Sequence, residues 1–88
     1  MDIEWDEAKR LINLRKHRID FRDAEKVLSG QTFTIEDTGP YGEQRFLTFG
    51  LLYGHVVVIA HTERNDRTRI ISMRKAVKHE RESYFNQF

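Results

Sequence analysis

The stretch that decides the fold runs from residue 45 to residue 73 and reads RFLTFGLLYGHVVVIAHTERNDRTRIISM. It predicts three strands, at Arg45–Leu52, His55–Glu63 and Arg67–Met73. Tyr53-Gly54 is typical of a tight turn between the first two strands. The second strand is β-branched and apolar through its centre, which favours a central strand covered on both faces. Strands with such short connections indicate an antiparallel meander.

The residues before this stretch predict one further strand and two helices. Thr32–Glu36 has the pattern of a strand. Asp6 suits the N-cap of a helix from Glu7 to His17, whose apolar residues recur at helical spacing. Asp20 restarts a helical pattern, for which Gly30 is a natural stop.

The two ends of the chain complete the predicted order of elements. Ile3–Trp5 indicates a short first strand, and Ala76–Phe85 predicts a C-terminal helix. The order is therefore (β)ααββββα in one domain, residues 1–88. This order indicates an α+β fold, in which two N-terminal helices and one C-terminal helix pack on an antiparallel sheet.

The composition excludes several classes of protein. No cysteine is present, so disulfides and thiolate metal sites are excluded. The histidines lack the spacing of a metal site, so we expect neither a metal nor another cofactor; they are His17, His55, His61 and His79. No apolar run approaches the ~20 residues that span a bilayer. The acidic N-terminus does not resemble a secretory signal, so we expect a cytoplasmic protein without a membrane partner.

The net charge of +1 conceals strong local fields. Between Arg64 and Arg81, seven basic residues stand against two acidic ones, and a second basic run from Lys9 to Arg18 contains no acid. Patches of this kind suit partners that carry phosphate groups. For any single residue, a solvated surface position is an equally good explanation.

The most informative segment is the predicted hairpin from His61 to Arg69, and the length of its turn leaves two registers open. A three-residue loop at 64–66 pairs Glu63 with Arg67 and His61 with Arg69, so that all four share one face of the sheet. Side-chain alternation makes this register incompatible with the alternative.

The alternative register has a two-residue turn, Asn65-Asp66. Glu63 then faces Thr68 and His61 faces Ile70, while the three arginines at 64, 67 and 69 collect on the opposite face with Thr62. The sequence alone does not choose between the two.

The first register would suit RNA cleavage without a metal ion. Glu63 or His61 would take the proton of the 2′-hydroxyl, and His17 or His79 would protonate the leaving oxygen. The phosphate would be clamped by arginines, namely Arg67, Arg69 and Arg74. The structural alternative is an ordinary cross-strand ion pair between Glu63 and an arginine.

Two basic groups outside the hairpin are further candidates for RNA contact. Lys16 and His17 end the first helix, where the helix dipole alone is an adequate explanation for cations. Arg74, Lys78 and Arg81 are spaced at i, i+4 and i+7, which predicts one basic stripe on the last helix.

Ordered motifs from Ile3 to about Tyr84 resemble the BrnT toxin family. The motifs are Trp5-Asp6-x-x-Lys9, Asn13-x-x-Lys16-His17, Ile19-x-Phe21-x-x-Ala24-x-x-Val27, Glu43-x-Arg45-Phe46-x-x-x-Gly50, His61-Thr62-Glu63-Arg64, Arg67-x-Arg69-Ile70-Ile71-Ser72-x-Arg74-x-Ala76 and Glu80-Arg81-x-x-Tyr84.

The resemblance implies the toxin of a type II toxin–antitoxin system, with a RelE-like fold. The expected activity is metal-independent endoribonuclease cleavage of RNA, which inhibits translation. The expected partners are the RNA substrate and a BrnA-like ribbon-helix-helix antitoxin, with operator DNA bound only through the antitoxin complex and a toxin homodimer within it.

The resemblance also implies the site residues. The catalytic surface would comprise Glu63, Arg64, Arg67, Arg69 and Arg74, with Lys16 and His17 as further members. Together with the charge patterns described above, this predicts RNA binding by Lys16, His17, His61, Lys78 and Arg81. Family members often have glycine after the Lys-His pair, where the helix ends in a left-handed conformation. Here Arg18 stands at that position, which implies a modest backbone cost.

Two other functions remain alternatives to a ribonuclease toxin. A non-catalytic module would bind RNA or the antitoxin through the same basic surface. A structural domain whose charges only confer solubility would require the long series of matching motifs to be accidental.

Overall fold

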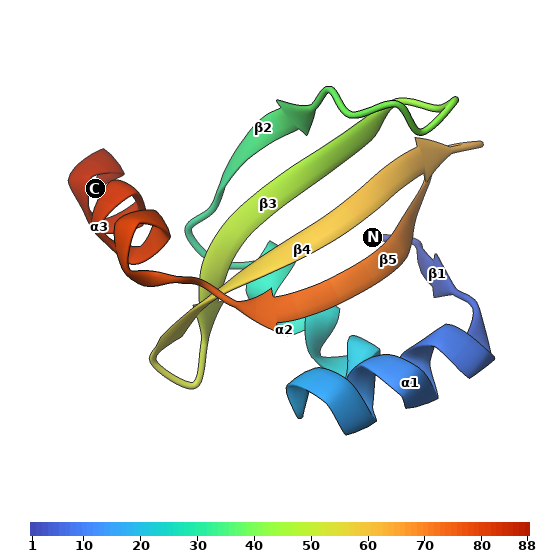
Figure 1. Ribbon diagram of the computed structural model, residues 1–88, viewed down its shortest axis with the longest axis horizontal. Coiled ribbons are helices and arrows are strands. Elements are labelled where there is room, and N and C mark those ends of the chain that lie inside the picture. The colour runs from blue at the N-terminus through green and yellow to red at the C-terminus, as the bar shows by residue number, and fades with distance from the viewer.

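A computed structural model describes all residues, 1–88, as an α+β fold with one five-stranded sheet (Figure 1). Along the chain the elements are β1 (Ile3–Trp5), α1 (Glu7–His17), the 3₁₀ helix η1 (Phe21–Asp23), α2 (Ala24–Leu28), β2 (Phe33–Asp37), β3 (Arg45–Leu52), β4 (His55–Arg64), β5 (Arg67–Lys75) and α3 (Lys78–Gln87). None of the helices is long and apolar enough to cross a membrane.

The sheet is mixed, whereas an antiparallel sheet was expected. Its strand order is β1-β5-β4-β3-β2, and the four strands from β2 to β5 form the predicted antiparallel meander. The difference is β1, which lies parallel to β5 and pairs with residues 68–70 only. A parallel partner is reached through a long connection, here the segment from α1 to β4, so no local pattern predicts it.

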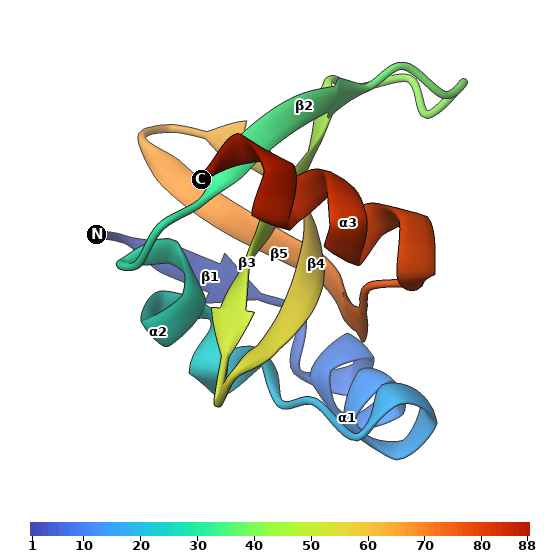
Figure 2. The ribbon, with the colours of Figure 1, turned by 90° about the vertical axis from the view of Figure 1, so that its left-hand side faces the viewer.

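The helices cover the two faces of the sheet unequally (Figures 1 and 2). One face carries the larger core, which includes Phe21 and Val27 of the N-terminal helical segment and Ile59 of β4. The other face packs against α3 through a smaller core around Tyr84. In Figure 1 α3 lies at one end of the strands, so the other end of that face has no covering helix.

The β4–β5 hairpin has the two-residue turn, so the second register is the observed one. Arg64 pairs with Arg67 on either side of Asn65 and Asp66. Both turn residues have a positive φ, 51° and 63°, as a type I′ turn requires. Asn and Asp tolerate this left-handed conformation better than other non-glycine residues.

A β-bulge interrupts the same hairpin further from the turn. His61 pairs with Ile70 and Ala60 pairs with Ser72, which leaves Ile71 without a partner on β4. An extra residue reverses the alternation of all side chains beyond it. Arg69 and Arg74 are five residues apart and would face opposite sides of a regular strand, but the bulge puts both on the face that α3 covers in part.

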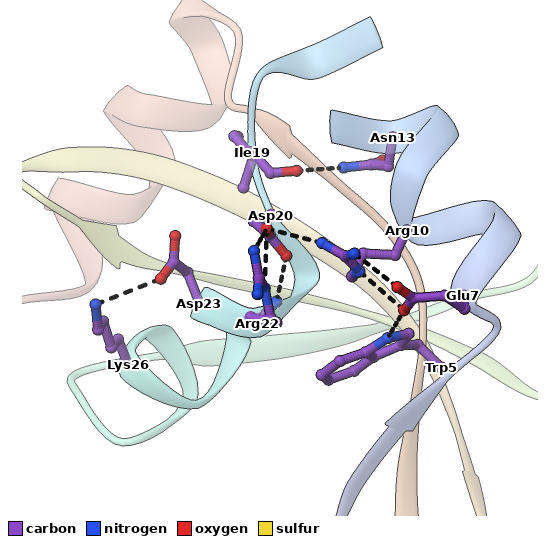
Figure 3. A network of polar contacts seen from close by, with 9 residues as sticks. All are labelled: Trp5, Glu7, Arg10, Asn13, Ile19, Asp20, Arg22, Asp23 and Lys26. Carbon is purple, nitrogen blue, oxygen red and sulfur yellow. Dashed lines mark hydrogen bonds and ion pairs between the residues drawn. The ribbon is translucent and has the colours of Figure 1, made fainter. Parts of the chain in front are cut away.

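Polar contacts anchor α1 to the segment that follows it (Figure 3). The Arg10 guanidinium donates to Glu7 at 2.6 Å and to Asp20 at 3.0 Å. Hydrogen bonds from Arg22 and Arg10 hold the pKa of the Asp20 carboxyl at about 2, below its ordinary 3.8. These bonds fix the direction in which the chain leaves α1.

Asn13 joins α1 to the edge of β5. Its side-chain amide donates to the Ile19 and Met73 carbonyls, each at 3.0 Å, and its side-chain oxygen accepts from the Met73 N–H at 3.1 Å. Trp5, the last residue of β1, pairs with Ile70. The part of β5 that follows Ile70 therefore has no neighbouring strand on this edge. Asn13 pairs the backbone groups of Met73 that would otherwise be buried without a partner.

Several predicted boundaries differ from the structure. The second helical segment is a 3₁₀ turn, Phe21–Asp23, followed by the short α2. The last helix begins at Lys78, and Arg74 belongs to β5, so the predicted helical stripe of Arg74, Lys78 and Arg81 is wrong for Arg74. β5 extends to Lys75 because its end still pairs with Val57 of β4.

The left-handed end of α1 is confirmed, and it provides a stability test. Arg18 has φ 61° and ψ 27°, and its side chain makes no ion pair in the structure. A left-handed conformation costs an L-residue about 1–2 kcal/mol, and glycine avoids this cost. We therefore expect Arg18→Gly to raise the free energy of unfolding by roughly 0.5–1 kcal/mol, measured by urea denaturation.

Arg18→Ala is the matched control, because alanine also lacks the guanidinium but keeps the backbone cost. An equal gain in the two variants would show that the side chain, and not the backbone, is responsible.

Candidate functional site

The uncovered end of the α3 face carries a cluster of arginines, which we call the arginine surface. It is formed by Arg64, Arg67 and Arg69 around Thr62. The register places these four side chains together, because Thr62 lies opposite Arg69 and Arg64 lies opposite Arg67. This is the arrangement expected from the two-residue turn.

The acidic residues near this surface lie at different distances from its arginines. Arg64 forms a close ion pair with Glu43 at 2.9 Å. Arg67 and Arg69 both lie 3.8 Å from Glu4 of β1, beyond hydrogen-bond distance. One carboxylate therefore faces two guanidinium groups without a close contact to either, and their N–H donors are available to another anion.

The Thr62 hydroxyl is the one buried side-chain polar group of the protein without a hydrogen-bond partner. The residue is only 3% exposed and lies between the arginines on the same face. A buried hydroxyl without a partner costs about 1–3 kcal/mol, so its position calls for an explanation. The sequence did not predict Thr62 as a site residue or Glu4 as the neighbour of Arg67 and Arg69, although the two-residue register does place Thr62 among the arginines.

Arg74 lies further along the same face, beyond the bulge. It pairs with Glu80 of α3 through two hydrogen bonds of 2.7 and 2.9 Å. The same carboxylate accepts from the Val77 N–H at the start of α3. Glu80 raises the pKa of Arg74, and the close pair fixes the position of the guanidinium.

Glu63 and His61 are on the opposite face from the arginines, so the structure does not bring the predicted base and the predicted phosphate clamp together. His61 is 6% exposed, and its two ring nitrogens lie 2.7 Å from the Thr48 hydroxyl and 2.8 Å from the Glu63 carboxylate. Glu63 also accepts a hydrogen bond from Thr68. His61 therefore has no free ring nitrogen with which to contact RNA.

A second basic site lies where the end of α1 meets the end of β5 and the start of α3. An open pocket there is lined by Lys16, His17, Arg74, Lys75 and His79, with Glu80 as its acid. The sequence left open whether the fold brings His17 or His79 near the arginines, and both line one pocket with Arg74. Ser72, on the arginine face, lines an adjoining pocket with Lys16 and His17.

Lys78 and Arg81 do not join either group. They line a separate pocket on α3 together with Phe85. The Arg81 guanidinium donates to the Ala76 carbonyl at 3.1 Å, which ties it to the start of its own helix.

Comparisons with known proteins agree on one family. A family model described as the ribonuclease toxin BrnT of type II toxin–antitoxin systems matches residues 5–80. The chain is similar to the crystal structure of the Brucella abortus ribonuclease toxin BrnT, with 32% sequence identity and a TM-score of 0.67. That similarity covers 89% of this chain and 99% of the Brucella chain. No curated protein matches the sequence.

The fold and the sequence lead to the same assignment. The match to the family model spans most of the chain, and the α+β fold with its five-stranded mixed sheet is similar to the solved structure of a BrnT toxin. A type II toxin–antitoxin family implies an RNA substrate and an antitoxin partner. The chain therefore belongs to the BrnT family, the ribonuclease toxins of type II toxin–antitoxin systems.

Proposed function

We propose that the RNA cleaved by this toxin lies along β5, with its phosphates held by the arginine surface and by Arg74. The observation that carries the proposal is the loose pairing of Arg67 and Arg69, which share Glu4 at 3.8 Å. Guanidinium groups bind phosphate oxygens in a bidentate manner, and this is stronger than a distant ion pair at an exposed surface. An RNA phosphate would therefore displace Glu4 at little cost.

The Thr62 hydroxyl supports the same position for the RNA. It lies beneath the arginines and has no partner in the protein. When Arg69 moves toward a phosphate, the hydroxyl becomes accessible and donates to a phosphate or ribose oxygen. The hydroxyl lacks a hydrogen-bond partner in the free protein, which costs free energy, and it gains a partner in the complex. This difference in free energy favours binding at this surface.

Cleavage proceeds in this proposal by attack of the ribose 2′-hydroxyl on the adjacent phosphorus, without a metal ion. Charge grows on the phosphate oxygens in the transition state, and the fixed cations of the surface stabilise it. Arginine is suited to this role, because it is charged at every physiological pH.

The partners and the cellular role are part of the same proposal. The antitoxin is a BrnA-like ribbon-helix-helix protein, and the complex, containing a toxin homodimer, binds operator DNA through the antitoxin. Cleavage of cytoplasmic RNA inhibits translation, as in RelE-like toxins. The family match and the basic surface support this view.

Removal of the two loosely paired arginines tests the binding surface. We expect Arg67→Ala and Arg69→Ala each to weaken RNA binding, most at low salt, because each loses a phosphate contact. For single-stranded RNA, the slope of log K against log salt concentration should fall by about 0.7 per arginine. Filter binding at several salt concentrations measures both quantities, and single-turnover cleavage should fall in parallel.

Arg22→Ala is the control for the loss of one positive charge, because Arg22 is 68% exposed in η1, in the other helical layer, and Asp20 keeps its hydrogen bond from Arg10 without it. Wild-type affinity and an unchanged salt slope in the Arg67/Arg69 double variant would rule out this surface as the RNA site.

The chemistry is tested on the substrate. A 2′-deoxy substitution at the cleaved nucleotide should block cleavage there, because the attacking hydroxyl is absent. Cleavage of the all-ribose substrate should continue in EDTA. Denaturing gel electrophoresis measures both outcomes, and loss of cleavage in EDTA that Mg²⁺ restores would contradict a metal-independent reaction.

A substitution of Glu63 tests whether this residue has the catalytic role first considered for it or the structural role that this proposal gives it. Because Glu63 binds His61 and Thr68 on the opposite face, we expect Glu63→Gln to lower the free energy of unfolding by about 1 kcal/mol. RNA cleavage at a temperature where the variant is folded should keep its wild-type rate. A loss of 100-fold or more in a folded variant would instead assign Glu63 a catalytic role.

A further inference from the structure

His17 stands at the junction of two pockets beside the proposed RNA path. One pocket joins it to Arg74 and His79, and the adjoining pocket joins it to Ser72. Ser72 and Arg74 share their face of β5 with Arg69, because the bulge at Ile71 restores the alternation. An RNA strand that follows β5 away from Arg69 therefore reaches the His17 ring.

The groups that face His17 from every neighbouring element are mostly cationic. They are Lys9 and Lys16 from α1, Arg74 and Lys75 from β5, and His79 and Glu80 from α3. Glu80 is engaged in its two close hydrogen bonds with Arg74. The remaining field is positive, which suits an anionic ligand and disfavours a protonated imidazole.

The protonation of His17 follows from this environment. Burial lowers its pKa from the ordinary 6.5, and the charges of Lys16 and Arg74 lower it further. At neutral pH the ring is therefore uncharged, and one of its nitrogens has a lone pair that can accept a proton. This state fits a base better than the acid role that the sequence suggested.

We propose that His17 is the general base of RNA cleavage, with the scissile phosphate bound between Arg74 and Lys16. The inference rests on the proposed function, because it places the reacting nucleotide on the path along β5. It gives the reaction a base on the arginine side of the protein, where Glu63 and His61 do not lie.

The step is a transesterification at phosphorus. The 2′-hydroxyl proton moves to the free ring nitrogen of His17 while the 2′ oxygen forms a bond to phosphorus. The bond from phosphorus to the 5′ oxygen breaks, and its electron pair leaves with that oxygen, which takes a proton from water. The products are a 2′,3′-cyclic phosphate and a 5′-hydroxyl, and the imidazolium returns its proton to solvent.

Single-turnover cleavage of a short RNA from about pH 5 to about pH 8 tests the proposal. We expect His17→Gln to lose about 100-fold or more in rate at neutral pH while its RNA affinity stays near that of the wild type. The wild-type rate should fall with acid once the pH drops below 6.5 through the lowered pKa of His17. This fall should be absent from the residual rate of His17→Gln.

Lys16→Gln provides an independent test that does not require removing the histidine. Without this cation the pKa of His17 rises, so the acidic fall in rate should move to higher pH. A fall that stays at the same pH would show that the titrating group is not His17, and would overturn the proposal.

His55→Gln is the matched control, because His55 is exposed at the start of β4 beside the β3–β4 turn. A folded His17→Gln variant that cleaves at the wild-type rate, or a 100-fold loss in His79→Gln alone, would also overturn the proposal. Those results would leave the binding surface intact, which depends on Arg67 and Arg69 and is tested by the salt dependence of RNA binding.

Discussion

The β4–β5 hairpin is subject to a strict constraint. Successive side chains of a strand point to opposite faces, so one residue more or less in a turn or strand moves every side chain beyond it to the other face of the sheet. Two local features of this hairpin use that constraint. The Asn65-Asp66 turn sends Arg64, Arg67 and Arg69 to one face and Glu63 to the other. The bulge at Ile71 then returns Arg74 to the arginine side. The charged surface of this toxin depends on both.

The second constraint is the free edge of β5. The short β1 pairs with only three residues of that strand, and α1 lies along the remainder, joined to it by Asn13. The same helix is held at its far side by the pairing of Arg10 with Asp20 (Figure 3). These contacts place the end of α1, and with it His17, beside Arg74. Neither contact involves RNA directly, yet both position the groups assigned to its cleavage.

The hydrogen-bonded series of Thr48, His61 and Glu63 shows why distances alone do not identify a catalytic site. A hydroxyl, an imidazole and a carboxylate lie 2.7 and 2.8 Å apart, as they would in a nucleophilic triad. Thr48 is only 2% exposed, and Thr34 also bonds to its hydroxyl. These contacts link β2, β3 and β4, and they keep the Thr48 hydroxyl away from solvent, so Thr48 is not placed as an accessible nucleophile.

The sequence by itself determined the local elements, the family and the basic character of the protein. The bounds of α1 and β3 agree with the helical spacing after Asp6 and the pattern before Tyr53, because both signals are local. Only the tertiary structure decided the parallel pairing of β1, the register of the hairpin and the meeting of His17 with Arg74. These depend on contacts between residues far apart in the chain, or on a single extra residue at a turn or bulge. Most of the charged groups were identified from the sequence. The side of the sheet on which each group lies depends on backbone pairing, which the composition and periodicity of the sequence do not encode.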